Sequence, residues 1–182
     1  MPSRGRRWLL PLQQCRDRRD AGTTRTQARA ACDLRLRRPP ECVGIHASRS
    51  ADRFQALEPV KQAVRQCHGG FAKGIAAGLR LRHDHGSQYV SHDFQAEIRF
   101  LGLESSPAFV REPEGNGCAE RFIRVLKENL LWVRRFDTVE ELRLALLAFR
   151  QTYNQSWIIE RHGYKTPAQV RAEQTTALPM AA

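Results

Sequence analysis

Residues 13–40 constrain the fold most, because they lack the side chains that a buried strand needs. From Gln13 to Pro40 the only large aliphatic or aromatic residues are Leu34 and Leu36. Buried strands are rich in valine, isoleucine, leucine and aromatic residues. We therefore predict no buried strand in this stretch and expect residues 1–40 to form a disordered arginine-rich arm.

Positive charge is concentrated in the same arm. The chain of 182 residues has a net charge of +11, and residues 1–40 contribute +8 through eleven arginines and three aspartates. Such a field suits contact with the phosphates of a nucleic acid. A solvated tail without a partner is the alternative, and composition alone favours that alternative.

The remaining composition is typical of a globular protein and excludes several classes. Apolar residues make up 41% of the chain, and the longest apolar run, at 144–149, is too short to cross a bilayer. The five cysteines form no CxxC pair and leave one residue unpaired, so reduced thiols are the simpler interpretation. We expect a cytoplasmic protein that is not associated with membrane. Its core should span residues 41–173 and be followed by a tail at 174–182.

Strand-like and helix-like segments alternate from Glu41 onward, which predicts an α/β class of fold. We expect strands at 42–47, 79–82 and 103–106, and helices at 50–67, 91–102, 116–133, 138–153 and 166–172. The spacing of apolar residues places Phe54, Phe94, Phe122 and Val133 toward the core. Pro59 is expected to break its helix or to start a shorter one.

Two acidic residues stand where α/β proteins place reactive groups. Asp84 follows a predicted strand, and Glu120 lies in the first turn of a predicted helix after a Gly-rich loop. Two carboxylates brought together repel each other, and a divalent cation with oxygen ligands relieves that repulsion. Each residue alone is more often structural, since such residues commonly cap turns or favour the helix dipole.

The residues around both positions resemble one family. Residues 83–89 (HDHGSQY) and 112–122 (EPEGNGCAERF), with thirty-five residues between Asp84 and Glu120, resemble insertion-sequence transposases that have a retroviral-integrase-like catalytic core of the DDE or DD35E type. Lys127 fits the same pattern. The tail, with Tyr153-Asn154 and residues 161–168, is similar to the usual ending of these enzymes.

The resemblance implies a ribonuclease H-like fold and DNA transposition. In the family, three acidic residues bind Mg²⁺ or Mn²⁺, DNA is nicked at the element ends, and the freed 3′-hydroxyl attacks target DNA. Asp84 matches the second acidic residue and Glu120 the third, which makes both catalytic metal ligands. Asn116 matches a polar position near the active site, and Lys127 could contact a DNA phosphate, although a solvated helix lysine is an equally good interpretation of Lys127. These two residues are the nucleic-acid-binding candidates, and the resemblance also implies a bacterial, nucleoid-associated protein. A homo-oligomer or a companion transposase subunit is the implied protein partner, beside the DNA of the element ends and target.

The first acidic residue of the family has no counterpart here. The resemblance places it in an apolar first strand, where this chain has its arginine-rich stretch. Asp17, Asp20 and Asp33 do not lie in such a run, and none is assigned. We expect an incomplete core whose first two strands are missing or replaced by an Arg-rich segment, as a frameshift or truncation of the gene would produce. Such a copy should be weak or inactive.

Three other interpretations stay open. One is a non-catalytic DNA-binding remnant of a transposase. A second is a transition-metal site built from His83 and His85, which project to the same side of an extended segment. The third is a ribonuclease or repair nuclease of similar fold. The tail motifs argue against this third interpretation.

Overall fold

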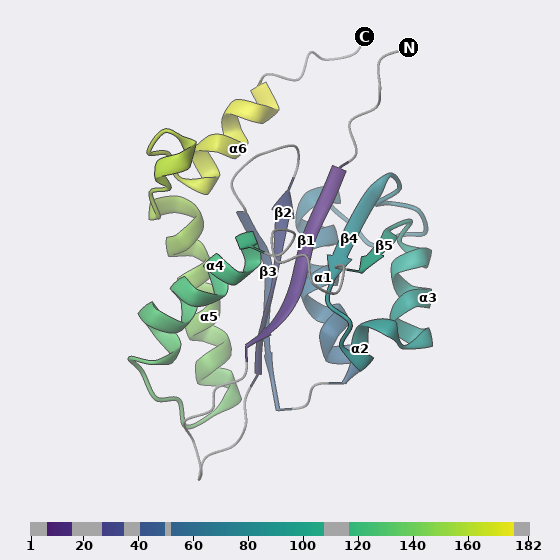
Figure 1. The fold of residues 1–182 in the computed structure, drawn as a ribbon, viewed down its shortest axis with the longest axis horizontal. Coiled ribbons are helices and arrows are strands. Elements are labelled where there is room, and N and C mark those ends of the chain that lie inside the picture. Colours follow the sequence, from purple (N-terminus) through teal and green to yellow (C-terminus); the bar gives the residue numbers. More distant parts are fainter. Residues whose placement is uncertain (1–6, 16–26, 35–40, 50–51, 108–116, 177–182) are drawn as a thin grey trace.

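The computed structural model describes residues 7–15, 27–34, 41–49, 52–107 and 117–176. Five strands form one sheet in the order β3-β2-β1-β4-β5 (Figure 1). The strands are β1 (Arg7–Cys15), β2 (Gln27–Leu34), β3 (Glu41–Ser48), β4 (Leu79–His83) and β5 (Glu104–Pro107). The first three pair antiparallel, and β4 is parallel to both β1 and β5.

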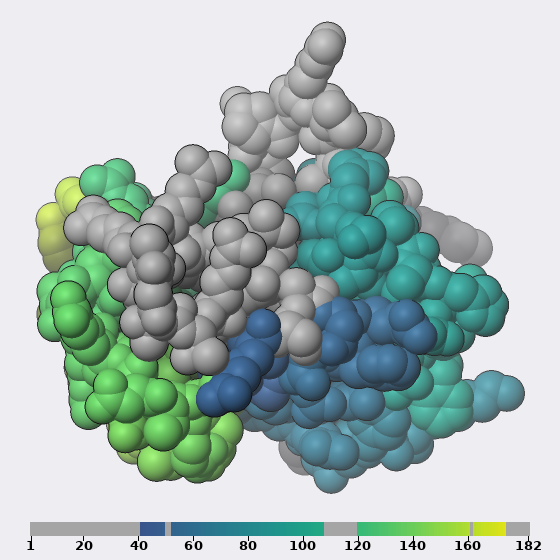
Figure 2. Space-filling view, turned by 90° about the horizontal axis from the view of Figure 1, so that it is seen from below, coloured from purple at the N-terminus to yellow at the C-terminus, as the bar shows by residue number. Residues whose placement is uncertain are grey.

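Helices cover both faces of this sheet. They are α1 (Arg53–His68), α2 (Ser87–Val90), α3 (His92–Phe100), α4 (Gly117–Leu126), α5 (Val139–Ser156) and α6 (Pro167–Thr176), with short turns η2 (Lys127–Leu131) and η3 (Glu160–His162). Figure 1 shows α1, α2 and α3 on one side of the strands and α4, α5 and α6 on the other. The space-filling view separates the same two groups, α1 and α3 in blue and teal and the C-terminal helices in green (Figure 2). The predicted α/β class is confirmed.

The core is correspondingly divided into two apolar clusters. One joins the strands to α1 and α3 through residues such as Leu57, Leu81 and Phe94. The other joins β3 to α4 and α5 through residues such as Ile45, Phe122 and Leu146. In β4, the leucines and His83 alternate with arginines and are buried, as the period of a strand requires.

Residues 1–40 contain the first two strands of the sheet, and β2 lies inside the stretch where no buried strand was expected, so the expectation that this stretch forms no strand is wrong. β2 pairs with β3 from Gln27 to Asp33, and β1 pairs with β2 on one side and β4 on the other. The backbone of almost any residue can join such a ladder, so β2 can pair although Leu34 is its one large apolar residue, whereas β1 contains Trp8 and three leucines. The register of β1 shifts around Pro11, which has no N–H to donate.

Side chains from the two helical layers form hydrogen bonds with the backbone of the edge strand β3. Asn154 of α5 accepts from the N–H of Cys42 at 2.9 Å and donates to the carbonyl of the same residue at 2.9 Å. Gln62 of α1 accepts from the N–H of Ile45 at 3.0 Å. These three backbone groups of the edge strand therefore have hydrogen-bond partners from the helices.

Helix α1 differs from its prediction in two ways. It continues through Pro59, and Phe54 is 56% exposed where the spacing placed it toward the core. The helix begins at the cap Asp52, whose side chain accepts from the N–H of Gln55, and ends at the left-handed Gly69. The ends of the helix are thus set by Asp52 and Gly69, and Pro59 lies inside it.

The helix that contains Glu120 also ends earlier than its apolar pattern predicts. Phe122, Ile123, Leu126 and Leu130 are buried, as expected, but Val133 is 71% exposed. The helix widens into the π-helical turn η2, where the N–H of Trp132 donates to the carbonyl of Lys127. Val133 therefore lies beyond the last turn, where helical periodicity no longer applies.

The remaining predicted elements are confirmed. Helix α3 is capped by Ser91 and ends beside Gly102, and Thr138 caps α5 by accepting from the N–H of Glu141 at 3.1 Å. Thr166 caps α6 in the same manner through Gln169. Among the described residues, no helix has the length and apolar character of a membrane span.

Candidate active site

Asp84 stands directly after β4, in a tight turn that presents its carboxylate. One carboxylate oxygen, Oδ1, accepts from the N–H of Gly86 at 2.7 Å. A Cβ added at Gly86 would lie 2.9 Å from that oxygen and 2.4 Å from Nε2 of Gln88. The glycine therefore leaves room for the carboxylate, which is half-buried and retains lone pairs for a cation.

Glu120 lies in the first turn of α4, on its exposed side. The helix is held by Phe122, which is 1% exposed and packs edge-on against Tyr153 with ring centroids 4.8 Å apart. Helix α4 packs on β1, and β1 pairs with β4, whose end carries Asp84. Figure 1 shows α4 beginning beside β1. Both predicted carboxylates are thus carried by elements that flank the same central strand.

That central strand contributes no third carboxylate. The sequence of β1 is RWLLPLQQC, and Leu12 pairs with His83, which places Leu12 and Gln13 level with the turn that bears Asp84. Among the described residues, no group of three or more His, Cys, Asp or Glu side chains could hold a metal ion. Asp84 and Glu120 each offer the oxygen ligands that Mg²⁺ prefers, and Mg²⁺ keeps several waters beside one or two carboxylates. They do not complete the three-carboxylate set.

His83 is engaged inside the core, which argues against a metal site of His83 and His85. Its side chain is 1% exposed, and its ring nitrogens lie 2.8 Å from the carbonyl oxygen of Asp84 and 2.8 Å from Oγ of Ser105. Burial lowers the pKa of His83 from 6.5, and the hydrogen bond to the Asp84 carbonyl offsets part of that effect. Metal ligation by His83 would have to break one of these hydrogen bonds. The structure therefore does not support a transition-metal site built from His83 and His85.

We expect this buried histidine to make the fold sensitive to acid. The pKa of His83 is lowered in the folded chain, so its stabilising effect is complete above about pH 6.5 and is lost as pH falls through the folded value. The melting temperature should therefore fall between about pH 7.5 and about pH 5, and less steeply in His83→Phe than in the parent. His92→Asn is the control, because that side chain is 93% exposed. Equal slopes in all three proteins would contradict the prediction.

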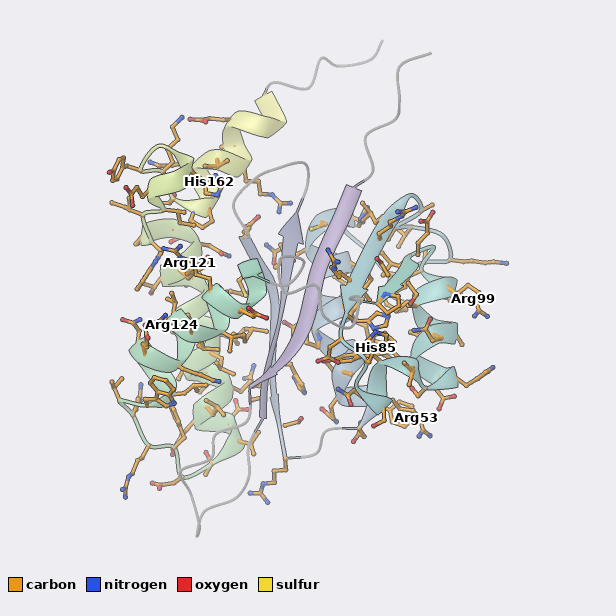
Figure 3. The ribbon with its side chains drawn as sticks, in the orientation of Figure 1. Arg53, His85, Arg99, Arg121, Arg124 and His162 are labelled. Atoms are coloured by element: carbon orange, nitrogen blue, oxygen red, sulfur yellow. The ribbon has the colours of Figure 1, made fainter. Side chains whose placement is uncertain are left out.

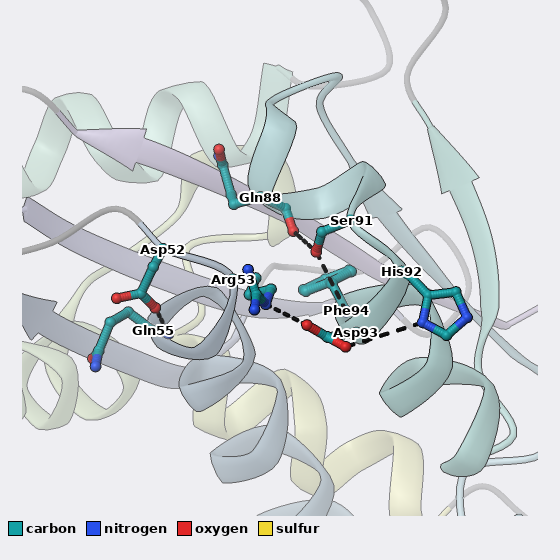
Figure 4. Close-up of polar contacts among 8 residues, drawn as sticks. All are labelled: Asp52, Arg53, Gln55, Gln88, Ser91, His92, Asp93 and Phe94. Carbon is teal, nitrogen blue, oxygen red and sulfur yellow. Dashed lines mark hydrogen bonds and ion pairs between the residues drawn. The ribbon is translucent and has the colours of Figure 1, made fainter.

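A polar network fixes the helices beside the Asp84 turn. Ser91 accepts from the N–H of Phe94 and donates to the carbonyl of Gln88 at 2.9 Å, which joins α2 to α3 (Figure 4). Arg53, at the start of α1, forms an ion pair with Asp93 of α3. Helix α3 is therefore joined to α2, which follows the Asp84 turn in the chain, and to the start of α1.

Basic side chains project from the helix that carries Glu120. Arg121 and Arg124 are exposed on α4, on the opposite side of the molecule from Arg53 and Arg99 (Figure 3). Arg124 donates to Glu128 at 2.7 Å, and this hydrogen bond raises its pKa. Lys127 is half-buried at the start of η2. Arg124 and Lys127 follow Glu120 by four and seven residues, a spacing that predicts one helix face, and of these two only Lys127 was among the predicted site residues.

Asn116 cannot be compared with its prediction, because it lies outside the described residues. The loop expected at 107–117 falls largely in the same gap, with Pro107 ending β5 and Gly117 beginning α4.

The sequence is similar to known proteins. Residues 101–167 match the sequence family described as "Integrase core domain". The transposase for insertion sequence element IS904 of Lactococcus lactis is 32% identical over 91 residues, which are 50% of this chain and 36% of that protein. The chain thus spans little more than a third of that relative's length.

Solved structures show the same fold. The catalytic core domain of BIV integrase aligns with a TM-score of 0.61 at 18% identity, covering 96% of this chain and 100% of that one. The HTLV-2 integrase catalytic core domain, solved in complex with magnesium, aligns with a TM-score of 0.59 at 14% identity over 91% of this chain and 95% of that one. The predicted ribonuclease H-like integrase core is confirmed.

Proposed function

We propose that this chain, a homologue of insertion-sequence transposases with an integrase-like core, acts on DNA in transposition or integration but has little or no strand-transfer activity of its own. Asp84 and Glu120 would hold a divalent cation, Mg²⁺ or Mn²⁺. When bound, the cation supplies charge stabilisation at the phosphate that is cleaved or joined. The nucleic-acid partner is the DNA of element ends and target.

One observation supports the proposed low activity. The central strand β1, which pairs with β4 and lies under α4, contains no acidic residue. Two metals that clamp the attacking and leaving oxygens require ligands from more than two carboxylates. Without a third carboxylate, Asp84 and Glu120 can orient one cation, and less of the negative charge of the transition state is stabilised.

The distribution of charge supports DNA as the partner. The chain carries a net charge of +11, and Arg121, Arg124 and Lys127 add cations beside Glu120. Lysine and arginine release counterions when they neutralise phosphates, which makes such binding dependent on salt. Asn116, which lies outside the described residues, and Lys127 are the proposed contacts. A second copy or a companion transposase subunit would bring two DNA ends together.

A strand-transfer assay with labelled duplex DNA tests this function. We expect no product above background from the purified chain in Mn²⁺, while duplex DNA still binds with an affinity that falls steeply with salt. Lys127→Ala should reduce the salt slope by about one. DNA binding that survives Asp84→Asn would support the non-catalytic remnant. Turnover that Asp84→Asn abolishes would contradict the proposed loss of activity.

A further inference from the structure

His83 is a central packing residue at the end of the sheet. Its ring lies 5.7 Å from the ring of Tyr89 in α2 and 6.0 Å from that of Phe94 in α3, measured between centroids. Tyr89 and Phe94 themselves pack edge-on at 5.4 Å. The imidazole is therefore held on several sides by elements that surround the Asp84 turn.

The hydrogen bonds define how this ring is protonated. The carbonyl oxygen of Asp84 can only accept, so Nδ1 of His83 must donate to it. In a neutral imidazole the other nitrogen, Nε2, is then an acceptor, and the hydroxyl of Ser105 donates to it. The two hydrogen bonds therefore connect the hydroxyl of Ser105 in β5, through the imidazole ring, to the main chain of Asp84.

We propose that His83, oriented by Ser105, is a positioning residue that fixes the Asp84 turn and thereby aims the Asp84 carboxylate. The inference rests on the proposed function, in which that carboxylate binds the cation. It assigns the histidine a role behind the metal ligand and not as a ligand.

The turn is held at two points that depend on each other. His83 fixes the carbonyl of Asp84, and the carboxylate of the same residue accepts from the N–H of Gly86 at 2.7 Å. Rotation of the Asp84 backbone would therefore disturb the Gly86 hydrogen bond as well. Partners behind a metal ligand typically change metal affinity by about 10- to 100-fold when they are removed.

Ser105→Ala is the most informative variant, because it removes the hydroxyl that orients the ring and changes little else. Ser105 is exposed at the edge strand β5, so the fold should tolerate the change. Ser105→Thr keeps a hydroxyl and is the matched control. His83→Phe keeps an aromatic ring between Tyr89 and Phe94 but removes both hydrogen bonds.

Two measurements on the full chain test the proposal. Amide hydrogen exchange, followed by NMR, reports on the Gly86 N–H without any metal, and titration with Mn²⁺ followed by electron paramagnetic resonance reports on the carboxylate. In Ser105→Ala and His83→Phe we expect Gly86 exchange to accelerate about tenfold and Mn²⁺ affinity to fall about tenfold, with amides in α5 unchanged. Ser105→Thr should restore both values.

The outcomes separate this inference from the proposed function. Unchanged Gly86 exchange in Ser105→Ala and His83→Phe would overturn the positioning role. So would an equal acceleration of amides throughout the core, since that indicates general loss of stability. If the parent chain binds no Mn²⁺, the proposed metal site fails, while Gly86 exchange still decides whether His83 positions the turn.

Discussion

Replacing Asn154 with alanine is expected to lower the free energy of unfolding by about 3 kcal/mol. The side chain is buried in α5, and its amide bonds both the N–H and the carbonyl of Cys42 on the edge strand β3. Truncation leaves two buried backbone groups without this partner, and each such group costs about 1–3 kcal/mol. Urea denaturation followed by circular dichroism measures the loss.

Asn129→Ala is the matched control for this change. Asn129 donates to the carbonyl of Val125 at 2.8 Å but is exposed on η2, so water can replace the bond. We expect a loss of less than about 0.5 kcal/mol. Equal effects of the two substitutions would show that the bond to Cys42 does not hold β3 against α5.

Replacing Gly44 with alanine is the second large change, with an expected loss of about 3 kcal/mol or more. A Cβ at this position would lie 2.2 Å from the carbonyl oxygen of Pro59 and 3.0 Å from its carbonyl carbon. These are backbone atoms of α1, so no side-chain rotation can relieve the overlap. Strand β3 and helix α1 would have to separate, which opens the apolar cluster between them.

Gly70→Ala serves as the control, because an added Cβ there meets only the side chain of Ile75, at 3.7 Å. Urea denaturation of both variants compares a backbone overlap with an ordinary contact. A Gly44→Ala protein as stable as the Gly70→Ala protein would contradict the close approach of β3 to α1.

Much of the fold after residue 40 could be predicted from local patterns. The alternation in β4 and the capping box at Thr138 each depend on residues close together in sequence. Strand β2 could not, because a backbone ladder places few demands on side chains and Leu34 is the one large apolar residue of that strand. Strand β1 did carry a signal, the apolar residues Trp8, Leu9, Leu10 and Leu12, which the prediction of a disordered arm passed over. The continuation of α1 through Pro59 was likewise missed, since end signals at Asp52 and Gly69 outweigh the local effect of proline.

The candidate site could likewise be predicted only in part from the sequence. Asp84 and Glu120 could be proposed from ordered motifs, since their spacing and neighbours are properties of the sequence. The role of His83 could not, because it depends on Ser105, which lies 22 residues away. Asn154 shows a related limit: the tail motif marks the residue, but its partner Cys42 lies 112 residues away, so only the packed structure reveals what the amide does.

A thermal melt by circular dichroism, with and without Mn²⁺, tests the central claim most directly. In the proposed function, the integrase-like core folds, and Asp84 and Glu120 bind one divalent cation. We therefore expect a cooperative transition that Mn²⁺ raises by several degrees in the parent chain and not in Asp84→Asn, because a cation that binds only the folded state stabilises it. A transition that Mn²⁺ leaves unchanged in the parent, or raises equally in Asp84→Asn, would contradict the proposed metal site.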